Sequence, residues 1–167
     1  MPASVIGKSL QLGYPGSDTR SSDQIKVNRL ATGNIVFGVP VVLNGDNTVS
    51  TFGASNTAAQ FLGIASRIVK QQTDIFNPMG GYRDKDPADV LVRGSVAVVF
   101  KGQGTPTAGG AVYIRIAANA LIPEAAIGDI EAQADGTNTL LLDNLRFTTG
   151  QTDASGVIEV TVLERRI

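Results

Sequence analysis

Residues 89–101 read Asp-Val-Leu-Val-Arg-Gly-Ser-Val-Ala-Val-Val-Phe-Lys, and this stretch decides the fold class. It is dominated by β-branched residues, which favour extended backbone. From Val96 to Lys101 the side chains alternate between the two faces of an extended chain, as in a β-strand. Gly94 divides the stretch into two parts. Residues 89–101 therefore predict a strand, interrupted near its middle.

Further strands are expected on both sides of this one. Residues 111–117 and 157–163 both alternate regularly between two faces. In the first of these, the alternation predicts that Arg115 points outward, as part of an ordinary basic surface. Residues 61–72 and 139–147 predict two more strands with less regular patterns.

The segment before residue 61 has the pattern of a hairpin. Residues 35–43 are rich in β-branched residues, but Gly38 and Pro40 interrupt them, which indicates a bulged or edge strand. Asn-Gly-Asp-Asn at residues 44–47 is a strong turn sequence. The returning strand is expected at residues 48–52.

Short strands separated by Gly, Pro and Asn turns, without a long amphipathic helix, predict a mainly β domain, either a sandwich or a barrel. Residues 34–167 show no internal repeat and no second core, so they predict one domain. Residues 1–33 differ, because a polar run at residues 17–23 cannot bury enough apolar surface to offset the entropy of ordering it. We therefore expect an extended N-terminal arm; a surface loop of the same domain is the alternative.

The composition points away from catalysis. The 167 residues include no cysteine and no histidine. Disulfides and thiolate chemistry are therefore excluded, and the commonest general base and zinc ligand are missing. We expect a protein that is not an enzyme and that has no cofactor and no metal site.

Two glycine- or acid-rich stretches invite a ligand-binding interpretation. Residues 102–110 begin like a dinucleotide-binding loop, but its third glycine would fall at Thr107, and a strand follows where the phosphate needs a helix. Asp84, Asp86 and Asp89 are an oxygen-rich set that could hold calcium. Their spacing lacks the required glycine and glutamate, and basic residues alternate with them, so a solvated loop is the better interpretation.

Charge and hydropathy limit the partners. The net charge is −1 and the densest basic cluster is Arg165-Arg166, so we expect no direct contact with nucleic acid. The longest apolar stretch, residues 35–43, is far shorter than the about 20 residues that cross a bilayer, and the N-terminus lacks a signal sequence. We therefore expect no membrane partner and synthesis in a cytoplasm. Charged residues make up 17% of the chain, below the usual share of about 25%. This suits a surface covered by protein partners; a surface rich in small polar residues is the alternative.

The order of short segments along the chain carries more information than any single motif. The segments are Tyr14-Pro15-Gly16, Ile-Val-Phe-Gly-Val-Pro-Val at 35–41, Phe-Leu-Gly-Ile-Ala at 61–65, Val-Leu-Val-Arg-Gly-Ser-Val-Ala-Val at 90–98, Gly-Gly-Ala-Val-Tyr at 109–113 and Glu-Val-Thr-Val at 159–162. This order resembles the cement, or decoration, proteins of tailed-bacteriophage heads over nearly the whole chain. Residues 117–147 match no part of that pattern.

The resemblance implies a β-rich domain, commonly a homotrimer, on the outer face of the phage head. There it would bind the major capsid protein at three-fold or quasi-three-fold positions and clamp the shell against internal DNA pressure. The segment that would contact the capsid contains Tyr14, Pro15, Gly16 and Arg20. A different virion module, such as a tail, fibre or glycan-binding protein with a site in residues 73–88, is the alternative. A small hydrolase using a carboxylate pair or Ser/Lys ranks third.

Overall fold

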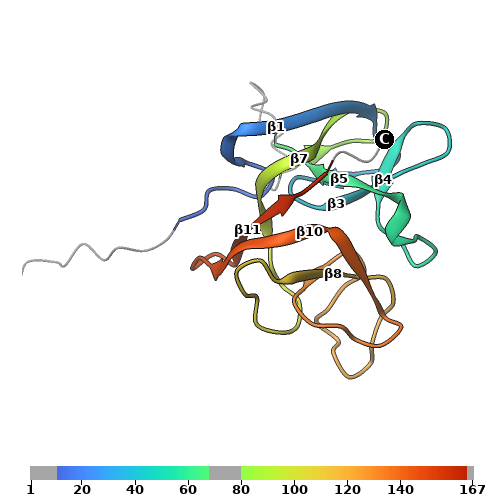
Figure 1. Cartoon of the computed structure of the whole chain (residues 1–167). Coiled ribbons are helices and arrows are strands. Elements are labelled where there is room, and N and C mark those ends of the chain that lie inside the picture. The colour runs from blue at the N-terminus through green and yellow to red at the C-terminus, as the bar shows by residue number, and fades with distance from the viewer. Residues whose placement is uncertain (1–10, 68–79, 165–167) are drawn as a thin grey trace, which may run out of the picture.

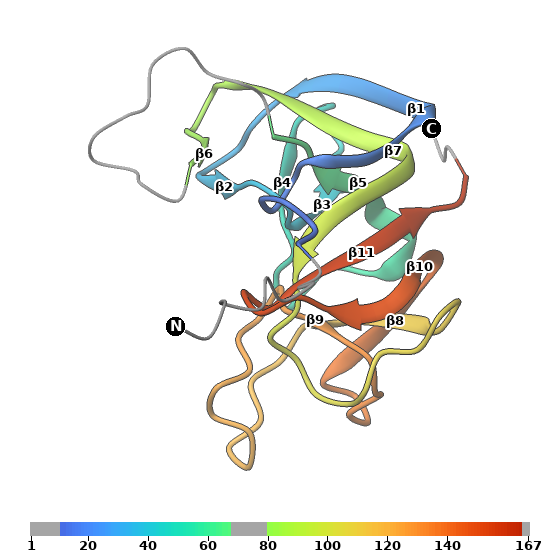
Figure 2. The same cartoon turned by 90° about the vertical axis from the view of Figure 1, so that its left-hand side faces the viewer.

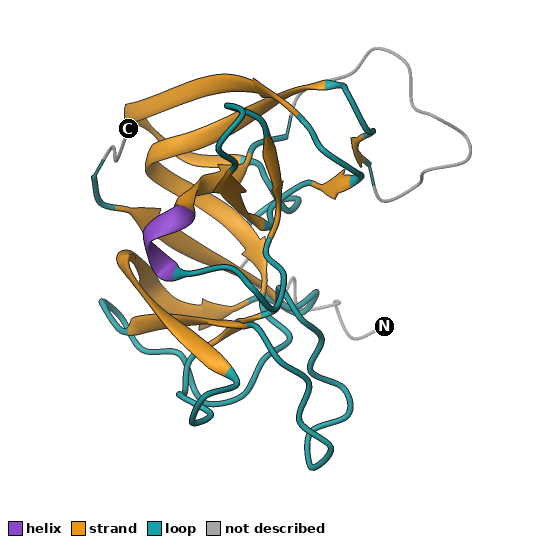
Figure 3. Cartoon of the chain, turned by 90° about the vertical axis from the view of Figure 1, so that its right-hand side faces the viewer, coloured by secondary structure: helices purple, strands orange, loops and turns teal. Residues whose placement is uncertain are grey.

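The computed structural model describes residues 11–67 and 80–164 and consists almost entirely of antiparallel strands (Figure 3). In chain order the strands are β1 (Asp18–Leu30), β2 (Ile35–Val36), β3 (Pro40–Leu43), β4 (Val49–Thr51), β5 (Phe61–Ala65), β6 (Gly81–Tyr82), β7 (Pro87–Val99), β8 (Ala111–Arg115), β9 (Ile130–Glu131), β10 (Thr139–Thr152) and β11 (Val157–Val162). One 3-10 turn, η1 (Ala58–Gln60), precedes β5. No helix in the described part of the chain is long and apolar enough to cross a membrane. The prediction of a mainly β domain is confirmed.

The long strand β7 belongs to both halves of the molecule. Strand β1 pairs with it between Pro87 and Val96 and β5 pairs with its first half, whereas β11 pairs with its second half. From β5 the sheet continues to β3 and β4, and from β11 it continues to β10, β8 and β9. Figure 1 shows the first group of strands above and the second below.

Each half of the sheet curls back on itself, so that β4 approaches the end of β1 and β9 approaches the end of β7. A parallel bridge between Ala31 and Val49 joins the chain after β1 to β4, and one between Phe100 and Ile130 joins the chain after β7 to β9. We call these halves the first ring (β1, β7, β5, β3, β4) and the second ring (β7, β11, β10, β8, β9). The architecture is therefore barrel-like, with one strand shared by two rings (Figure 2).

Two apolar clusters form the core, and the second includes side chains from strands of both rings. The first contains Val90 and Val92 of β7, and the second contains Val96 and Val98 of the same strand. Leu91 belongs to the second cluster, so the regular alternation of β7 is interrupted before Val96. The interruption lies at Gly94, whose φ of +115° is a conformation that few residues other than glycine adopt. Strand β7 nevertheless runs unbroken from Pro87 to Val99, so Gly94 changes the alternation of side chains but does not divide the strand as predicted.

The segment predicted as an N-terminal arm is extended where it is described. Residues 1–10 lie outside the described residues, and β1 pairs antiparallel with β7. Ile25 and Val27 of β1 pack on the first cluster, while Lys26 points to solvent. This part of the segment is thus ordered by lying on β7 of its own chain. The arm boundary at residue 33 stays a prediction.

Candidate functional site

The N-terminal turn, Tyr14 to Ser17, places an aromatic side chain on the surface. The amide of Ser17 donates to the carbonyl of Tyr14 at 3.0 Å and closes the turn. Tyr14 is 69% exposed. The guanidinium carbon of Arg67 lies 4.9 Å from its ring centroid and 5.5 Å from that of Phe37. These cation–π contacts hold the Tyr14 ring in place while leaving most of it accessible.

Gly16 anchors the N-terminal turn to the sheet and is itself buried. Its amide donates to the carbonyl of Ala97 and its carbonyl accepts from the amide of Arg67, both at 2.7 Å. A Cβ on Gly16 would lie 2.9 Å from the Arg67 nitrogen and 3.0 Å from that of Gly38, and its φ is +81°. Pro15 packs against Gly38 from the same turn. Gly16 and Pro15 therefore position the turn, and Tyr14 is the member with a large exposed side chain.

Arg20, the fourth predicted contact residue, lies near the start of β1 and forms an ion pair with a residue of β11. Its Nε lies 2.8 Å from Oε1 of Glu159 on β11, and Thr19 donates to the same oxygen at 2.6 Å. The Arg20 side chain is 61% exposed, whereas that of Glu159 is 3% exposed. Burial acts to raise the pKa of Glu159, but the hydrogen bonds from Arg20 and Thr19 outweigh it and the net effect lowers the pKa.

An open groove of about 490 Å³ lies beside this ion pair. Leu12 and Gly13 line one part of it, and Thr149 and Gln151 of β10 line another. The amide of Leu12 donates to the carboxylate of Asp153 at 3.2 Å, which ties the N-terminal segment to the β10–β11 turn. Of the four predicted contact residues, Arg20 lines this groove, whereas Tyr14 is exposed outside it and Gly16 is buried.

The Glu159 ion pair makes a pH-dependent contribution to stability. Because the folded-state pKa lies below the ordinary value of 4.5, the carboxylate stabilises the fold above that pH. This contribution is lost as the pH falls through the lowered pKa. We expect Glu159→Gln to reduce the free energy of unfolding by about 1 kcal/mol at pH 7, since one partner is exposed. Chemical denaturation from pH 7 to pH 3 should show the two proteins converging; a difference that persists at low pH would contradict the assignment.

The acid-rich turn between β6 and β7 does not gather its carboxylates. They accept hydrogen bonds from separate donors: Asp84 from the Gly33 amide (2.8 Å), Asp86 from the Arg83 amide (2.9 Å) and Asp89 from the Asn28 side chain (2.8 Å). Across residues 11–67 and 80–164, no three His, Cys, Asp or Glu side chains are arranged to hold a metal ion. These carboxylates shape the turn and its junction with β1.

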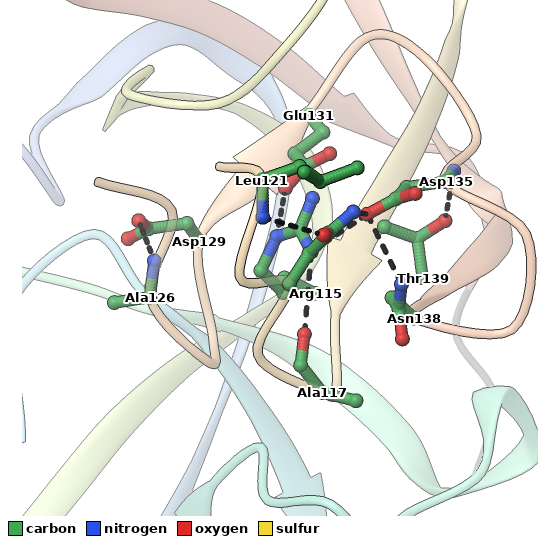
Figure 4. Close-up of polar contacts among 10 residues, drawn as sticks. Arg115, Ala117, Leu121, Ala126, Asp129, Glu131, Asp135, Asn138 and Thr139 are labelled. Atoms are coloured by element: carbon green, nitrogen blue, oxygen red, sulfur yellow. Dashed lines mark hydrogen bonds and ion pairs between the residues drawn. The ribbon is translucent and has the colours of Figure 1, made fainter. Parts of the chain in front are cut away.

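The environment of Arg115 differs from the one that alternation along the sequence predicts. It is fully buried rather than facing solvent, and so is Glu131, with which its Nε forms an ion pair (Figure 4). Its Nη1 lies 2.9 Å from Oδ2 of Asp135 and donates to the carbonyl of Ala117 at 3.2 Å. The hydrogen bond to Glu131 is the main cause that raises the pKa of Arg115. The outward face of β8 is covered by the segments that follow it, and alternation alone does not reveal that cover.

The polar network continues from Arg115 into the loop after β8. Oδ2 of Asp135 accepts hydrogen bonds from the side chains of Asn119 at 2.9 Å and Asn138 at 3.3 Å. Asn119, followed by Arg115, contributes most to lowering the pKa of Asp135. We call Arg115, Asn119, Glu131 and Asp135 the loop network. No sequence motif marks it.

Comparison with known proteins adds evidence from outside the chain. Residues 1–163 match the model of a family described as structural cement protein (E217 gp24/Pam3 gp6). No curated protein sequence matches. Among solved structures, a chain of the capsid of Myoviridae phage XM1 is similar, with a TM-score of 0.74 and 18% sequence identity over 97% of both chains. At that identity, the structural likeness shows a shared fold.

Proposed function

Because this chain belongs to the family of phage structural cement proteins, we propose that it binds the major capsid protein on the outside of a phage head and reinforces the shell. Family membership makes it a structural, capsid-associated protein of the virion. The finer proposal is a homotrimer at three-fold or quasi-three-fold positions that holds the head against internal DNA pressure. The observation that carries it is the family match over residues 1–163, which leaves almost none of the chain unaccounted for.

The physical character of the chain supports a role that is structural and not enzymatic. A cement protein needs rigidity and a broad contact surface rather than a general base, and this chain has no histidine and no cysteine. Two rings that share β7 form a stiff unit in which the sheet is largely closed on itself. A trimer would offer three copies of each contact, and simultaneous binding raises the overall affinity without any new contact.

The N-terminal turn is the proposed capsid contact. Tyr14 provides an exposed aromatic surface that is already held in place by Arg67, so little freedom would be lost on binding. Arg20 provides an exposed guanidinium at its ion pair with Glu159. Pro15 and Gly16 contribute by fixing the turn against the sheet.

Binding to capsids prepared without the protein tests both the function and the contact. We expect the wild type to co-sediment with such capsids, to raise the temperature at which they release DNA, and to have a trimer mass by light scattering. Tyr14→Ala should weaken binding by about tenfold, as for an aromatic anchor of an interface, without changing the mass of the free protein.

Tyr14→Phe is the conservative variant, because it keeps the ring over which Arg67 lies. Leu163→Ala is the matched control at another exposed apolar side chain, which is 44% exposed. Absence of capsid binding by the wild-type protein would overturn the proposed function. Binding by Tyr14→Ala as tight as that of the wild type would overturn only the contact.

A further inference from the structure

The loop between β8 and β9, residues 116–129, carries the most exposed large apolar side chain in the described part of the chain. Leu121 is 90% exposed, and Ile127 on the same loop is 45% exposed. The charged residues of the loop, Glu124 and Asp129, are both acidic. No lysine or arginine occurs between residues 116 and 145, so the loop itself combines apolar and negative groups.

The loop is held firmly at its base. Strands β8 and β9 pair through Tyr113 with Glu131 and Ile114 with Ile130. The amide of Gly128 donates to the carbonyl of Arg115 at 2.8 Å, which brings the two ends of the loop together. Figure 2 shows the loop projecting below β9, at the end of the molecule away from β1.

Hydrogen bonds connect the buried arginine to the backbone of the exposed leucine. Arg115 binds Asp135, Asp135 accepts from the Asn119 side chain at 2.9 Å, and Oδ1 of Asn119 accepts from the amide of Leu121 at 3.0 Å. The amide of Ile122 also donates to the carbonyl of Asn119, at 2.9 Å. The loop network therefore fixes the position from which the Leu121 side chain projects (Figure 4).

This arrangement is difficult to explain by stability alone. An exposed leucine side chain contributes no hydrophobic free energy to folding. A buried ion pair is also not needed for stability, because replacing one by apolar residues is often neutral or stabilising. Loops of this length without secondary structure are uncommon in compact domains and are usually functional. Ordering the loop in the free protein lowers the entropy cost of binding a partner. The loop network is therefore best explained as a device that orders the loop before it binds a partner.

We propose that the β8–β9 loop is a second capsid contact, in which Leu121 enters an apolar socket of the major capsid protein that is bordered by Lys or Arg side chains. The acidic character of the loop requires the basic border, because unlike charges across an interface favour the correct pairing. This inference rests on the proposed function. It adds a contact within residues 117–147, which match none of the short segments on which the sequence resemblance rests.

Leu121→Asp is the decisive variant, with Leu30→Asp as its matched control. Leu30 is a 54% exposed leucine on β1 in the other ring, so it receives the same chemical change at a distant place. We expect Leu121→Asp to weaken binding to capsids by about tenfold or more, as for a central interface side chain, and Leu30→Asp to bind like the wild type. Unchanged thermal unfolding of both variants would show that the fold is intact.

Asn119→Ala tests the positioning role separately. It keeps the Leu121 side chain and removes the hydrogen bonds to Asp135 and to the Leu121 amide. We expect a capsid affinity between those of the wild type and Leu121→Asp, which supports the proposal.

Full binding by Leu121→Asp, or an equal loss for both aspartate variants, overturns the proposal while leaving the function intact. A Leu121→Asp protein of lower solution mass that still binds capsids assigns the loop to a second copy of this chain, which also overturns it. Absence of wild-type binding overturns the function and this inference together.

Discussion

Gly63→Ala is expected to lower the free energy of unfolding by about 3 kcal/mol, at the upper end of the usual cost of overpacking. Gly63 lies in β5, which passes directly beside β7. A Cβ at this position would lie 2.1 Å from the carbonyl oxygen of Leu91 and 2.9 Å from a side-chain carbon of Val90. The Leu91 group is backbone of the strand shared by both rings, so no flexible side chain can move aside. The two strands would have to separate.

Gly45→Ala is the matched control, because a Cβ on Gly45 meets nothing within 4 Å and its φ is not in the left-handed region. We expect its effect to stay within about 0.5 kcal/mol. Denaturant unfolding followed by far-ultraviolet circular dichroism measures both proteins. Equal stability of the two variants would mean that β5 and β7 are not packed as closely as described.

Strands β7 and β11 are predicted closely by the sequence patterns. Residues 89–101 and 157–163 predict strands within two residues of β7 and β11. Both stretches are rich in β-branched residues, and both pair along most of their length, so local preference and tertiary pairing agree. Residues 139–147 predict only the first part of β10, because the bulged continuation to Thr152 has a polar composition.

Strand β1 is much less visible in the sequence. The polar run at residues 17–23 resembles an unstructured arm, and the register with β7 shifts repeatedly between Asp18 and Lys26. What orders this segment is a partner strand far along the chain together with the Glu159 carboxylate that Arg20 and Thr19 bind. Alternation within a short window carries no information on such distant partners.

The candidate sites also divide into features that the sequence indicates and features that depend on residues far along the chain. The resemblance directs attention to Tyr14, which the structure places on the surface, and to Gly16, which it buries. Alternation along β8 assigns Arg115 to the outside of the strand but does not predict that the residues after β9 cover it. A buried arginine depends on where its carboxylates are in space, and both Glu131 and Asp135 come from segments without a regular pattern.

That buried arginine leads to the second large expected effect: Arg115→Met should lower the free energy of unfolding by about 3–5 kcal/mol. The change leaves the Glu131 carboxylate fully buried without its cation. In the wild type, Nη2 of Arg115 and Oε2 of Glu131 already have no hydrogen-bond partner among the described residues. No neighbouring donor is therefore in place to compensate the Glu131 carboxylate once the arginine is removed. Asp135 suffers less, because it is partly exposed and keeps Asn119.

Arg93→Met is the control, since Arg93 also pairs with a carboxylate, Asp23, but both side chains are largely exposed. An exposed pair contributes little, so we expect a change of about 0.5 kcal/mol or less. The double variant Arg115→Met/Glu131→Leu should recover much of the loss, because the penalty comes from the unpaired charge rather than from the missing attraction. Denaturant unfolding of the wild type, the two single variants and the double variant separates the cost of the unpaired Glu131 charge from the loss of the ion-pair attraction. If the double variant is no more stable than Arg115→Met, the ion pair contributes attraction that apolar packing cannot replace, and burial of an unpaired Glu131 is not the cause of the loss.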